Sequence, residues 1–403
     1  MGFERPACIL QINRLRKERI HQPGEEDEEM IEMFKEWYDA KHEYAKEWKE
    51  KTGGKVMGYF CTYVPEEILL AADVLPVRIL GSHEPQDVTE PHIFGMFCPF
   101  CRDCLAQGLK GRYDYLDGLM IAQSCLHIRQ AYTSWEMHIP VPFSYYLPMP
   151  NKVQSPRAVP YLKGELERFK KAVEDWTEKE ITDEDLDRGI EMMNKNRRLM
   201  REAYELRKEA DPPMTGLEAM YMAVSSQTIE KNDHSDILEE TIKELQGRKL
   251  ERSTGQRLMI LGSENDDTKF VDMVEGCGST IVADDHCTGS RYFWNDVQPN
   301  GDRLLAIAER YVQRPPCPSK DWEVRTRIPH ILNIAKDWNV SGAILLQQKF
   351  CDPHELDIPS IKKTLESNGI QTLFLELDVT VAVGQFKTRV EAFLEMLEGE
   401  DLF

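Results

Sequence analysis

Six of the ten cysteines in the chain have a spacing or a position that suits metal–sulfur chemistry. They are Cys98, Cys101, Cys104, Cys125, Cys287 and Cys351. The first three form a Cys-x2-Cys-x2-Cys motif, which brings several sulfurs within reach of one iron–sulfur cluster, and thiolate sulfur is a ligand that iron prefers. Residues 1–8 lack the apolar core of a signal peptide. We therefore expect a reducing, cytoplasmic setting in which the cysteines stay free or bind metal.

The composition indicates a globular protein and argues against two classes of partner. The chain has 403 residues, of which 41% are hydrophobic and 30% are charged. At roughly 150 residues per domain this length suits two domains or three. No apolar run approaches the roughly 20 residues that span a bilayer. The net charge of −20 argues against binding to nucleic acid and to an anionic membrane surface.

The first part of the chain is predicted to be a helical extension followed by an α/β domain. Aromatic and apolar side chains recur at helical spacing over 25–51, which predicts a helix. After Gly53-Gly54 the pattern changes to short apolar runs typical of buried strands. The predicted strands are 56–61, 74–80 and 115–122. Cys125 follows the last strand, at the carboxyl end where open α/β sheets bind their ligands.

The later part is predicted to be a helical segment followed by a second α/β domain. Residues 160–249 are rich in charge, with a helix start at Asp183-Glu184-Asp185 and a break at 211–216. The strands predicted after them are 257–263, 279–285, 342–348 and 372–378. Cys287 and Cys351 follow the second and third of these, which suits a cofactor held in a cleft between two domains. The predicted division is an N-terminal helical extension 1–54, a cluster-binding α/β domain 55–159, a helical segment 160–250 and a second α/β domain 251–403.

Six segments, taken in order, resemble one known family. They are Tyr63-Val64-Pro65-Glu66-Glu67-Ile68-Leu69, Phe97-Cys98-Pro99-Phe100, Ser124-Cys125-Leu126-His127-Ile128-Arg129, Asp284-Asp285-His286-Cys287-Thr288-Gly289, Lys349-Phe350-Cys351-Asp352-Pro353 and Leu375-Glu376-Leu377-Asp378. The chain is similar to the 2-hydroxyacyl-CoA dehydratase and ATP-dependent (class I) benzoyl-CoA reductase family, in particular to the smaller of the two catalytic subunits of benzoyl-CoA reductase, the C type. The resemblance implies an α/β fold with two flavodoxin-like parallel-sheet domains, a helical insert and a helical N-terminal extension.

The resemblance also implies the cofactor and its ligands. It implies an iron–sulfur cluster of the [4Fe-4S] type, held by Cys98, Cys125 and Cys351, with a double cubane as the alternative. Cys101 and Cys104 depart from the family pattern and leave open a differently ligated or larger cluster. Cys287 follows a strand as a ligand should, although Cys351 matches the third family ligand better.

The implied activity is that of an oxidoreductase in anaerobic aromatic degradation. It would reduce benzoyl-CoA, an aryl-CoA substrate, to a cyclohexadiene carboxyl-CoA by low-potential single-electron transfer. The alternatives are a 2-hydroxyacyl-CoA dehydratase subunit acting through a ketyl radical, an electron-relay subunit and a double-cubane reductase. The implied partners are a homologous larger catalytic subunit, ATP-hydrolysing activator subunits with their own [4Fe-4S] cluster, and reduced ferredoxin upstream. The chain has no Gly-x4-Gly-Lys-Ser/Thr loop, so we do not expect it to hydrolyse ATP.

Four further residues are candidates for the site, each with a structural alternative. His127 and His286 could donate a proton or hydrogen-bond a cluster sulfur, or could be structural histidines. Arg129 and Arg291 could bind CoA phosphates, or could form salt bridges. The remaining cysteines at 61, 277 and 317 are predicted to be small buried packing residues. Glu66 and Glu67 begin a helix after Pro65, where the helix dipole alone would explain them.

Overall fold

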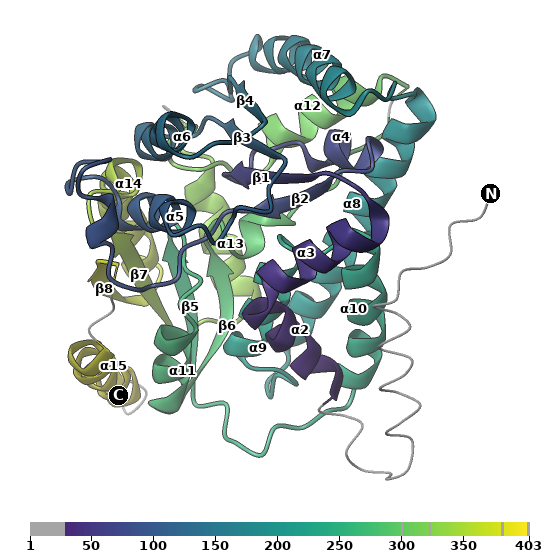
Figure 1. Cartoon of the computed structure of the whole chain (residues 1–403). Helices are drawn as coiled ribbons and strands as arrows, with labels where there is room; N and C mark the ends of the chain where they lie inside the picture. The colour runs from purple at the N-terminus through teal and green to yellow at the C-terminus, as the bar shows by residue number, and fades with distance from the viewer. Residues whose placement is uncertain (1–28, 300, 322–323, 380–382, 401–403) are drawn as a thin grey trace.

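The computed structural model describes residues 29–299, 301–321, 324–379 and 383–400, and within them two sheets of four parallel strands each (Figure 1). The first sheet has the order β2-β1-β3-β4 and consists of β1 (Val56–Phe60), β2 (Leu75–Arg78), β3 (Gly118–Ala122) and β4 (Phe143–Leu147). The second has the order β6-β5-β7-β8 and consists of β5 (Gln256–Gly262), β6 (Ser279–Asp285), β7 (Gly342–Gln348) and β8 (Gln371–Leu377). Each order places its first strand between the second and the third, as flavodoxin-like sheets do. The predicted α/β fold is confirmed.

The central strands are continuous apolar runs because both faces of a parallel sheet are covered by helices. Every residue of β1, β3, β6 and β7 is buried. The sequence analysis missed β4, an edge strand whose side chains are mostly half-buried. Pro142 directly before it and Pro148 directly after it favour a loop when the sequence is read alone. Burial on one side only therefore weakened the apolar signal.

The helices form four groups. The N-terminal extension contains α2 (Glu29–Asp39) and α3 (Lys41–Thr52), and residues 1–28 of the predicted extension lie outside the described part. The first sheet is accompanied by α4 (Glu66–Ala71), α5 (Pro99–Leu109) and α6 (Leu126–His138). The helical segment contains α7 (Ala158–Thr177), α8 (Asp183–Glu205), α9 (Gly216–Ser225) and α10 (Lys231–Leu245). The second sheet is accompanied by α11 (Thr268–Gly276), α13 (Arg327–Asp337), α14 (Asp352–Glu366) and α15 (Val383–Glu400). The helix α12 (Arg303–Gln313) follows β6 in the chain but packs against α7.

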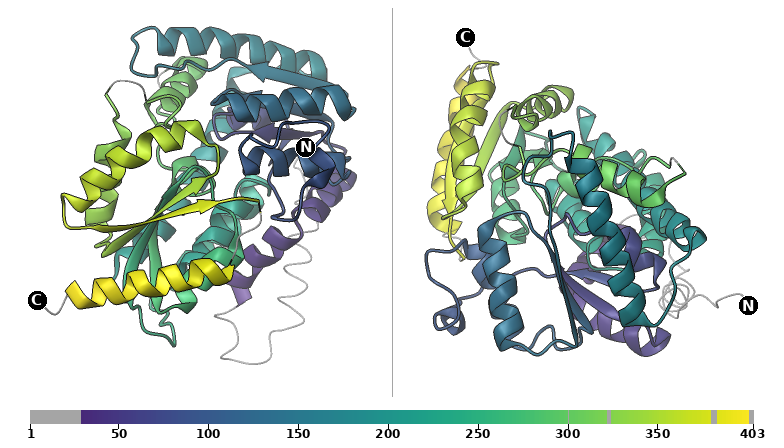
Figure 2. Two further views of the ribbon diagram at one scale, coloured as in Figure 1. Left: turned by 90° about the vertical axis from the view of Figure 1, so that its left-hand side faces the viewer. Right: turned by 90° about the horizontal axis from the view of Figure 1, so that it is seen from above.

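The two sheets lie in separate parts of the molecule and the helical segment braces them. Figure 2 shows the first unit, in purple and blue, beside the second unit, in green and yellow. The helices α8 and α10 run along the side where the N-terminal helices also lie (Figure 1). The predicted helix start at 183–185 is confirmed, since Thr182 caps α8 through a capping box with Asp185. A second capping box, between Thr215 and Glu218, starts α9 after the predicted break.

Two buried acids fasten the first unit to the helical segment. Glu67 is fully buried and pairs with Arg197 of α8 at 2.7 Å. Glu66 pairs with the buried Lys231 at the start of α10, at 3.2 Å. The helix dipole therefore does not account for this Glu-Glu pair by itself, because each acid has a buried cationic partner in another helix. The pairs explain why the helical segment is an integral part of the fold.

Candidate active site

Seven cysteines line one cavity between the two sheets. They are Cys61, Cys98, Cys101, Cys125, Cys287, Cys317 and Cys351. Cys61 directly follows β1, and three others come soon after β3, β6 and β7. In each sheet the first strand lies beside the third, so the cavity forms where the switch points of two parallel sheets face one another. Its volume is about 80 Å³, below the roughly 300–1,000 Å³ of drug-sized ligand sites, which suits a compact group.

Three of these cysteines share one local geometry. Cys98 is the N-cap residue of α5, Cys125 that of α6 and Cys351 that of α14. In none of the three does the sulfur cap its own helix. The first backbone N–H groups of a helix and its dipole stabilise negative charge, and they lower the cost of a thiolate at that place. The three residues that the family resemblance implies as ligands thus lie at three helix N-termini around one cavity.

The sulfurs are close enough to interact, and they divide into two groups joined by Cys125. Cys98 hydrogen-bonds with Cys101 and Cys351. Cys61 interacts with Cys287 and Cys317 on the other side of the cavity. Burial raises the pKa of the Cys125 thiol, and the neighbouring Cys351, Cys317 and Cys61 raise it further. Metal binding would release these protons, since thiolate is the ligand form.

Cysteine pKa values are raised on the Cys98 side as well. The hydrogen bond with Cys98 is the largest single influence on Cys101 and lowers its pKa, but burial and the neighbouring thiols of Cys125, Cys104 and Cys351 together raise the pKa to about 12. For Cys98 the hydrogen bond with Cys101 is the largest cause of a pKa well above the usual value. In the absence of a cation these thiols are therefore protonated. A bound metal group must supply positive charge to convert them to thiolates.

Buried cations surround the sulfurs. Arg78, at the end of β2, donates to the Cys287 Sγ at 3.1 Å and to its carbonyl oxygen at 2.6 Å. Arg291 and Arg314 also line the cavity. Lys320 lies next to it, and burial lowers the pKa of its amine to about 8 even though nearby thiols oppose the shift. Several cations in one apolar cavity are costly unless negative charge faces them, so this wall is suited to thiolates and an anionic cluster.

The donor set fits an iron–sulfur cluster better than a single ion. Among residues 29–299, 301–321, 324–379 and 383–400, no group of three or more His, Cys, Asp or Glu side chains converges on one metal-ion position. Iron–sulfur clusters are held by cysteine thiolates, and seven cysteines line this cavity. Cys98, Cys125 and Cys351 would hold such a group. Cys61, Cys287 and Cys317 form a second set of three facing the same cavity.

The two predicted histidines lie outside the cavity lining. His127 Nδ1 accepts a hydrogen bond from the backbone N–H of Cys98 at 3.0 Å, and its ring contacts Phe97. Burial lowers the pKa of His127. His286 lies in a separate small cavity, with Nδ1 2.9 Å from the hydroxyl of Thr288. His127 is therefore placed to position Cys98, and His286 is placed to hold its own loop.

The two predicted arginines have different surroundings. Arg129 is exposed on α6 above the ring of Tyr146, with its guanidinium carbon 5.8 Å from the ring centre. It stays a candidate for CoA phosphate binding. Arg291 is buried in the cavity wall and donates to the carbonyl oxygens of Gly262 and Ser263 at 2.7 and 2.8 Å. Its Nε lies 3.7 Å from the Asp285 carboxylate, and Cys287 and Cys317 are also near, so its charge acts inside the cavity wall and not on a phosphate outside.

Other cavity residues differ from the sequence-based expectation. Cys104 does not line the cavity, because α5 turns its sulfur toward the Ile79 carbonyl oxygen at 3.5 Å. Cys61 and Cys317 were predicted to be packing residues, yet both are only partly buried and line the cavity. Cys61 is the last residue of the predicted strand 56–61, so the strand-end argument applied to it as well. Cys317 lies in the loop between α12 and α13, where no local signal could identify it.

Two non-cysteine groups in the wall were also missed. His354, in the first turn of α14, is buried, and its Nε2 has no hydrogen-bond partner among the described residues. Burial is the main reason that its pKa lies well below the usual value, so the ring is neutral. Glu264, just after β5, contributes a buried carboxyl to the cavity. Neither stands in a pattern that sequence alone associates with a cluster.

The fold and the site define a two-unit α/β protein with a thiol-rich cavity between its sheets. The chain belongs to the 2-hydroxyglutaryl-CoA dehydratase, D-component, family, whose family model matches residues 61–397. The predicted family membership is confirmed. No helix in the described part of the chain is long and apolar enough to cross a membrane.

Three relatives cover most of the chain. It is 26% identical to the (R)-phenyllactyl-CoA dehydratase beta subunit of Clostridium sporogenes, over 90% of this chain and 97% of the relative. It is 25% identical to the C subunit of benzoyl-CoA reductase of Thauera aromatica, over 81% and 86%. It is 27% identical to the beta subunit of (R)-2-hydroxyglutaryl-CoA dehydratase of Acidaminococcus fermentans, over 86% and 93%. The relatives are thus subunits of acyl-CoA dehydratases and of an acyl-CoA reductase.

Proposed function

We propose that this chain is the iron–sulfur subunit of an enzyme that adds low-potential single electrons to an acyl-CoA thioester. The observation that carries the proposal is one cavity lined by cysteines from both sheets and walled by buried arginines. The names of the relatives support the substrate class, because each name refers to an enzyme that acts on an acyl-CoA thioester. When bound, an iron–sulfur cluster supplies single electrons at low potential.

Residues around the cavity would stabilise the charge of the cluster and limit the access of water to it. The N-termini of α5, α6 and α14 stabilise negative charge on the sulfurs of Cys98, Cys125 and Cys351. Arg78 and Arg291 offset the remaining charge. The small and buried cavity excludes bulk water, which would otherwise consume the electron by side reactions. His127 fixes the backbone of Cys98.

We propose benzoyl-CoA as the substrate and a cyclohexadiene carboxyl-CoA as the product. The sequence segments at 124–130 and 284–289 and the Thauera relative support this choice. Dehydration of a 2-hydroxyacyl-CoA is the alternative, and the names of the other two relatives support it. Turnover of benzoyl-CoA against that of (R)-phenyllactyl-CoA, with an ATP-dependent electron donor, separates the two reactions.

A specific observation favours a second candidate for the cofactor. Cys61, Cys287 and Cys317 form a second set of three interacting thiols in the cavity that also contains Cys98, Cys125 and Cys351, and Cys125 interacts with both sets. Two sets of three suit a larger group, such as the double cubane of a small-molecule reductase. In that case Arg78, which contacts the Cys287 sulfur, would belong to the second half of the site.

Iron and acid-labile sulfide analysis with EPR, on anaerobically purified protein, tests both proposals. Serine at 98, 125 or 351 should remove the cluster signal if these residues are the ligands. The change Cys104→Ser is the matched control, because Cys104 is a buried cysteine of the same helix α5 but lies outside the cavity. Loss of about half the iron in Cys61→Ser, Cys287→Ser and Cys317→Ser indicates the larger cofactor. Protein that contains no iron overturns the proposed function.

We further propose that the chain works in the cytoplasm together with a homologous larger catalytic subunit. An ATP-hydrolysing activator with its own [4Fe-4S] cluster would supply the electrons, and reduced ferredoxin would supply the activator. The relatives support the assembly, because their names describe beta and C subunits. All cysteines in the described residues are free of disulfides, which suits a reducing compartment. Purification from the native cells by a tag on this chain should recover a second catalytic subunit. Recovery of this chain as a homodimer alone contradicts the two-subunit arrangement.

A further inference from the structure

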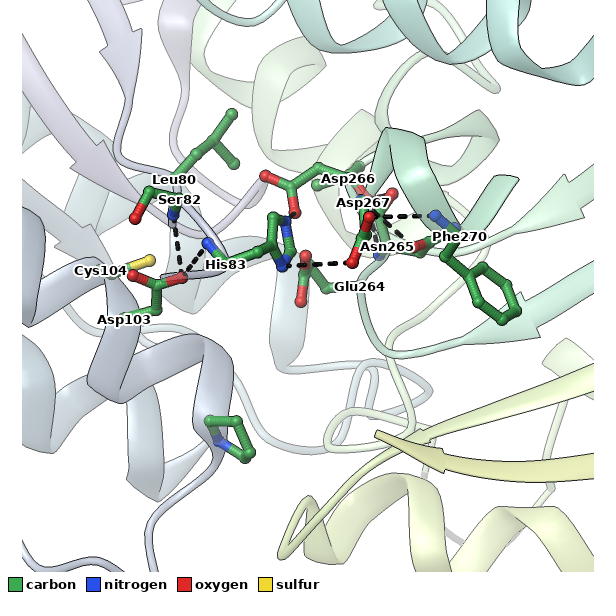
Figure 3. Close-up of polar contacts among 12 residues, drawn as sticks. Leu80, Ser82, His83, Asp103, Cys104, Glu264, Asn265, Asp266, Asp267 and Phe270 are labelled. Atoms are coloured by element: carbon green, nitrogen blue, oxygen red, sulfur yellow. Dashed lines mark hydrogen bonds and ion pairs between the residues drawn. The ribbon is translucent and has the colours of Figure 1, made fainter. Parts of the chain in front are cut away.

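A row of polar side chains leads from the surface to the cysteine-lined cavity. His83, in the loop after β2, has a side chain that is 26% exposed, and its Nε2 lies 2.7 Å from Asp266 Oδ1. Asp266 is buried, and its carboxyl hydrogen-bonds with that of Glu264. Glu264 is 2% exposed and lines the cavity. Figure 3 shows the His83 ring among the acidic residues that follow β5.

The loop of His83 is held in place from α5. Asp103 Oδ2 accepts hydrogen bonds from the backbone N–H groups of Ser82 and His83 at 2.9 and 2.8 Å (Figure 3). His83 itself has a φ of 59°, in the left-handed region that a non-glycine residue rarely adopts. At Gly81 a Cβ atom would lie 2.3 Å from the Asp103 carboxylate, so only glycine permits this close approach. Such strain is maintained where the surroundings over-determine it, which is common at functional sites.

The carboxyl of Glu264 needs a proton. Its Oε2 accepts a hydrogen bond from the side chain of Gln348 at 3.2 Å. Its Oε1 receives no hydrogen bond from any N–H or O–H donor of the described residues. Two buried carboxyls in contact are stable only when a proton lies between them. Glu264, which lines the cavity, therefore shares an acidic proton with Asp266.

We propose that His83, Asp266 and Glu264 form a relay that carries protons from solvent to the cavity. Glu264 gives its carboxyl proton to an acceptor in the cavity and becomes a carboxylate. The imidazolium of His83 then gives a proton to the Asp266 carboxylate, Asp266 passes it on to the Glu264 carboxylate, and the neutral His83 that remains is reprotonated by hydronium or a buffer acid in the solvent. The net change is one proton moved inward, with no electron moved by these residues. The identity of the acceptor, an electron-rich acyl-CoA intermediate, rests on the proposed function.

The charge states of the three groups agree with this order. Burial opposes protonation of His83, but Asp266 outweighs it and raises the pKa of the imidazole to about 9. Burial would raise the pKa of Asp266, yet His83 holds it below the usual range. Burial and the nearby Asp266 raise the pKa of Glu264 well above its usual value. Other charged or titratable groups that act on the three are Lys41, Arg78, Asp103, Asp267 and Cys287.

Infrared difference spectroscopy on the anaerobic holoprotein tests the relay without turnover. At neutral pH the wild type should show the carbonyl stretch of a protonated carboxyl, shifted in D2O, and Glu264→Gln should lack it. The matched control is Asp267→Asn, because Asp267 also faces His83 but serves as the N-cap of α11, a role that asparagine keeps. The band should persist in this control. A spectrum in which Glu264→Gln still shows the full band overturns the relay.

Turnover gives a second readout that a purely structural role would not affect. Glu264→Gln should lower kcat by about 100-fold or more, within the range for loss of a general acid, and leave KM unchanged. His83→Ala should lower kcat, and added imidazole should restore part of the rate because the position is open to solvent. Unchanged kcat in Glu264→Gln, or no recovery with imidazole, contradicts the relay. If the wild type turns over no acyl-CoA, the proposed function fails, and the infrared result alone decides the relay.

Discussion

At the scale of residues, the position of a cysteine relative to a helix sets the electrostatic surroundings of its sulfur. Cys98, Cys125 and Cys351 belong to different segments, but each stands one residue before a helix. The N-cap residue keeps its side chain outside the helix and near unpaired backbone N–H groups. A sulfur at this place meets favourable electrostatics before any metal binds. The common position explains how three distant cysteines come to suit one anionic group.

Sequence could indicate some of these residues but not their partners. The strand-end rule identifies Cys125, Cys287 and Cys351, and all three line the cavity. Arg78 could not be identified, because its contact with Cys287 joins residues 209 positions apart. Glu264 could not be identified for the same reason, since only folding brings His83 next to the loop that follows β5. The local sequence pattern shows which residues lie at the carboxyl ends of strands. Packing between distant segments decides which side chains those residues contact.

The first prediction concerns His127 and its hydrogen bond to Cys98. His127→Leu removes the acceptor and leaves the Cys98 backbone N–H without a partner, at a cost of about 1–3 kcal/mol in stability. His127→Asn offers a side-chain oxygen as an acceptor and should retain most of the iron content. The measurement is iron content and thermal unfolding of both variants. Equal loss of activity in the two variants, with iron retained in both, would instead indicate a proton-donating role for His127.

At the scale of elements, an apolar run decided which strands could be predicted, and this held even for the edge strand β8, most of whose side chains are half-buried or exposed. The strands β5, β6, β7 and β8 lie within one residue of their predicted bounds, because parallel strands are continuous apolar runs between turns. The predicted helix over 25–51 is two helices in the described part, divided near Ala40. The division has no Pro or Gly to mark it, and the backbone of Ala40 has φ −106° and ψ 24°, outside the regular helical region. Periodicity alone cannot reveal such a break.

The second prediction compares two glycines inside helices. A Cβ atom at Gly189 of α8 would lie 2.2 Å from the backbone oxygen of Glu67 in α4. Helix propensity favours alanine over glycine by about 0.5–1 kcal/mol, but a clash with backbone costs about 1–3 kcal/mol, so Gly189→Ala should destabilise the protein. At Gly164 of α7 an added Cβ atom would have no atom of the described residues within 4 Å, so Gly164→Ala should stabilise it. Urea unfolding midpoints measure both effects, and a stabilising Gly189→Ala would contradict this account of α4–α8 packing.

At the scale of the whole molecule, the cavity depends on two sheets held with their carboxyl ends toward each other. The sequence predicts the two α/β units and a cleft between them. It does not reveal how the units are fixed, because the fixing groups are buried ion pairs between distant segments. Glu67 of α4 meets Arg197 of α8, and Tyr311 of α12 donates to Glu67 at 3.1 Å. One carboxylate therefore links the first unit, the helical segment and a helix of the second unit.

The third prediction tests that carboxylate. Glu67→Gln keeps the shape of the side chain but leaves the buried Arg197 without its anion, so we expect a loss of about 3–5 kcal/mol in the free energy of unfolding at pH 7. The double variant Glu67→Gln/Arg197→Met also removes the directly paired cation, so that only the nearby Arg310 loses an interaction with the carboxylate. It should recover a large part of that loss. Urea unfolding of both variants under anaerobic conditions is the measurement, and a double variant no more stable than Glu67→Gln would contradict the pairing.

The stability that the Glu67–Arg197 ion pair contributes should depend on pH in a definite direction. Burial raises the pKa of Glu67, but Arg197 and Arg310 outweigh it, and the pKa lies below the ordinary value of 4.5. A carboxylate with a depressed pKa in the folded state contributes stability above the unfolded value, and this contribution is lost as the pH falls through the folded pKa. The difference in stability between wild type and Glu67→Gln should therefore be constant above about pH 6 and shrink below pH 4.5. A difference that stays constant down to pH 3 would show that the negative charge of Glu67 does not hold the two units and the helical segment together.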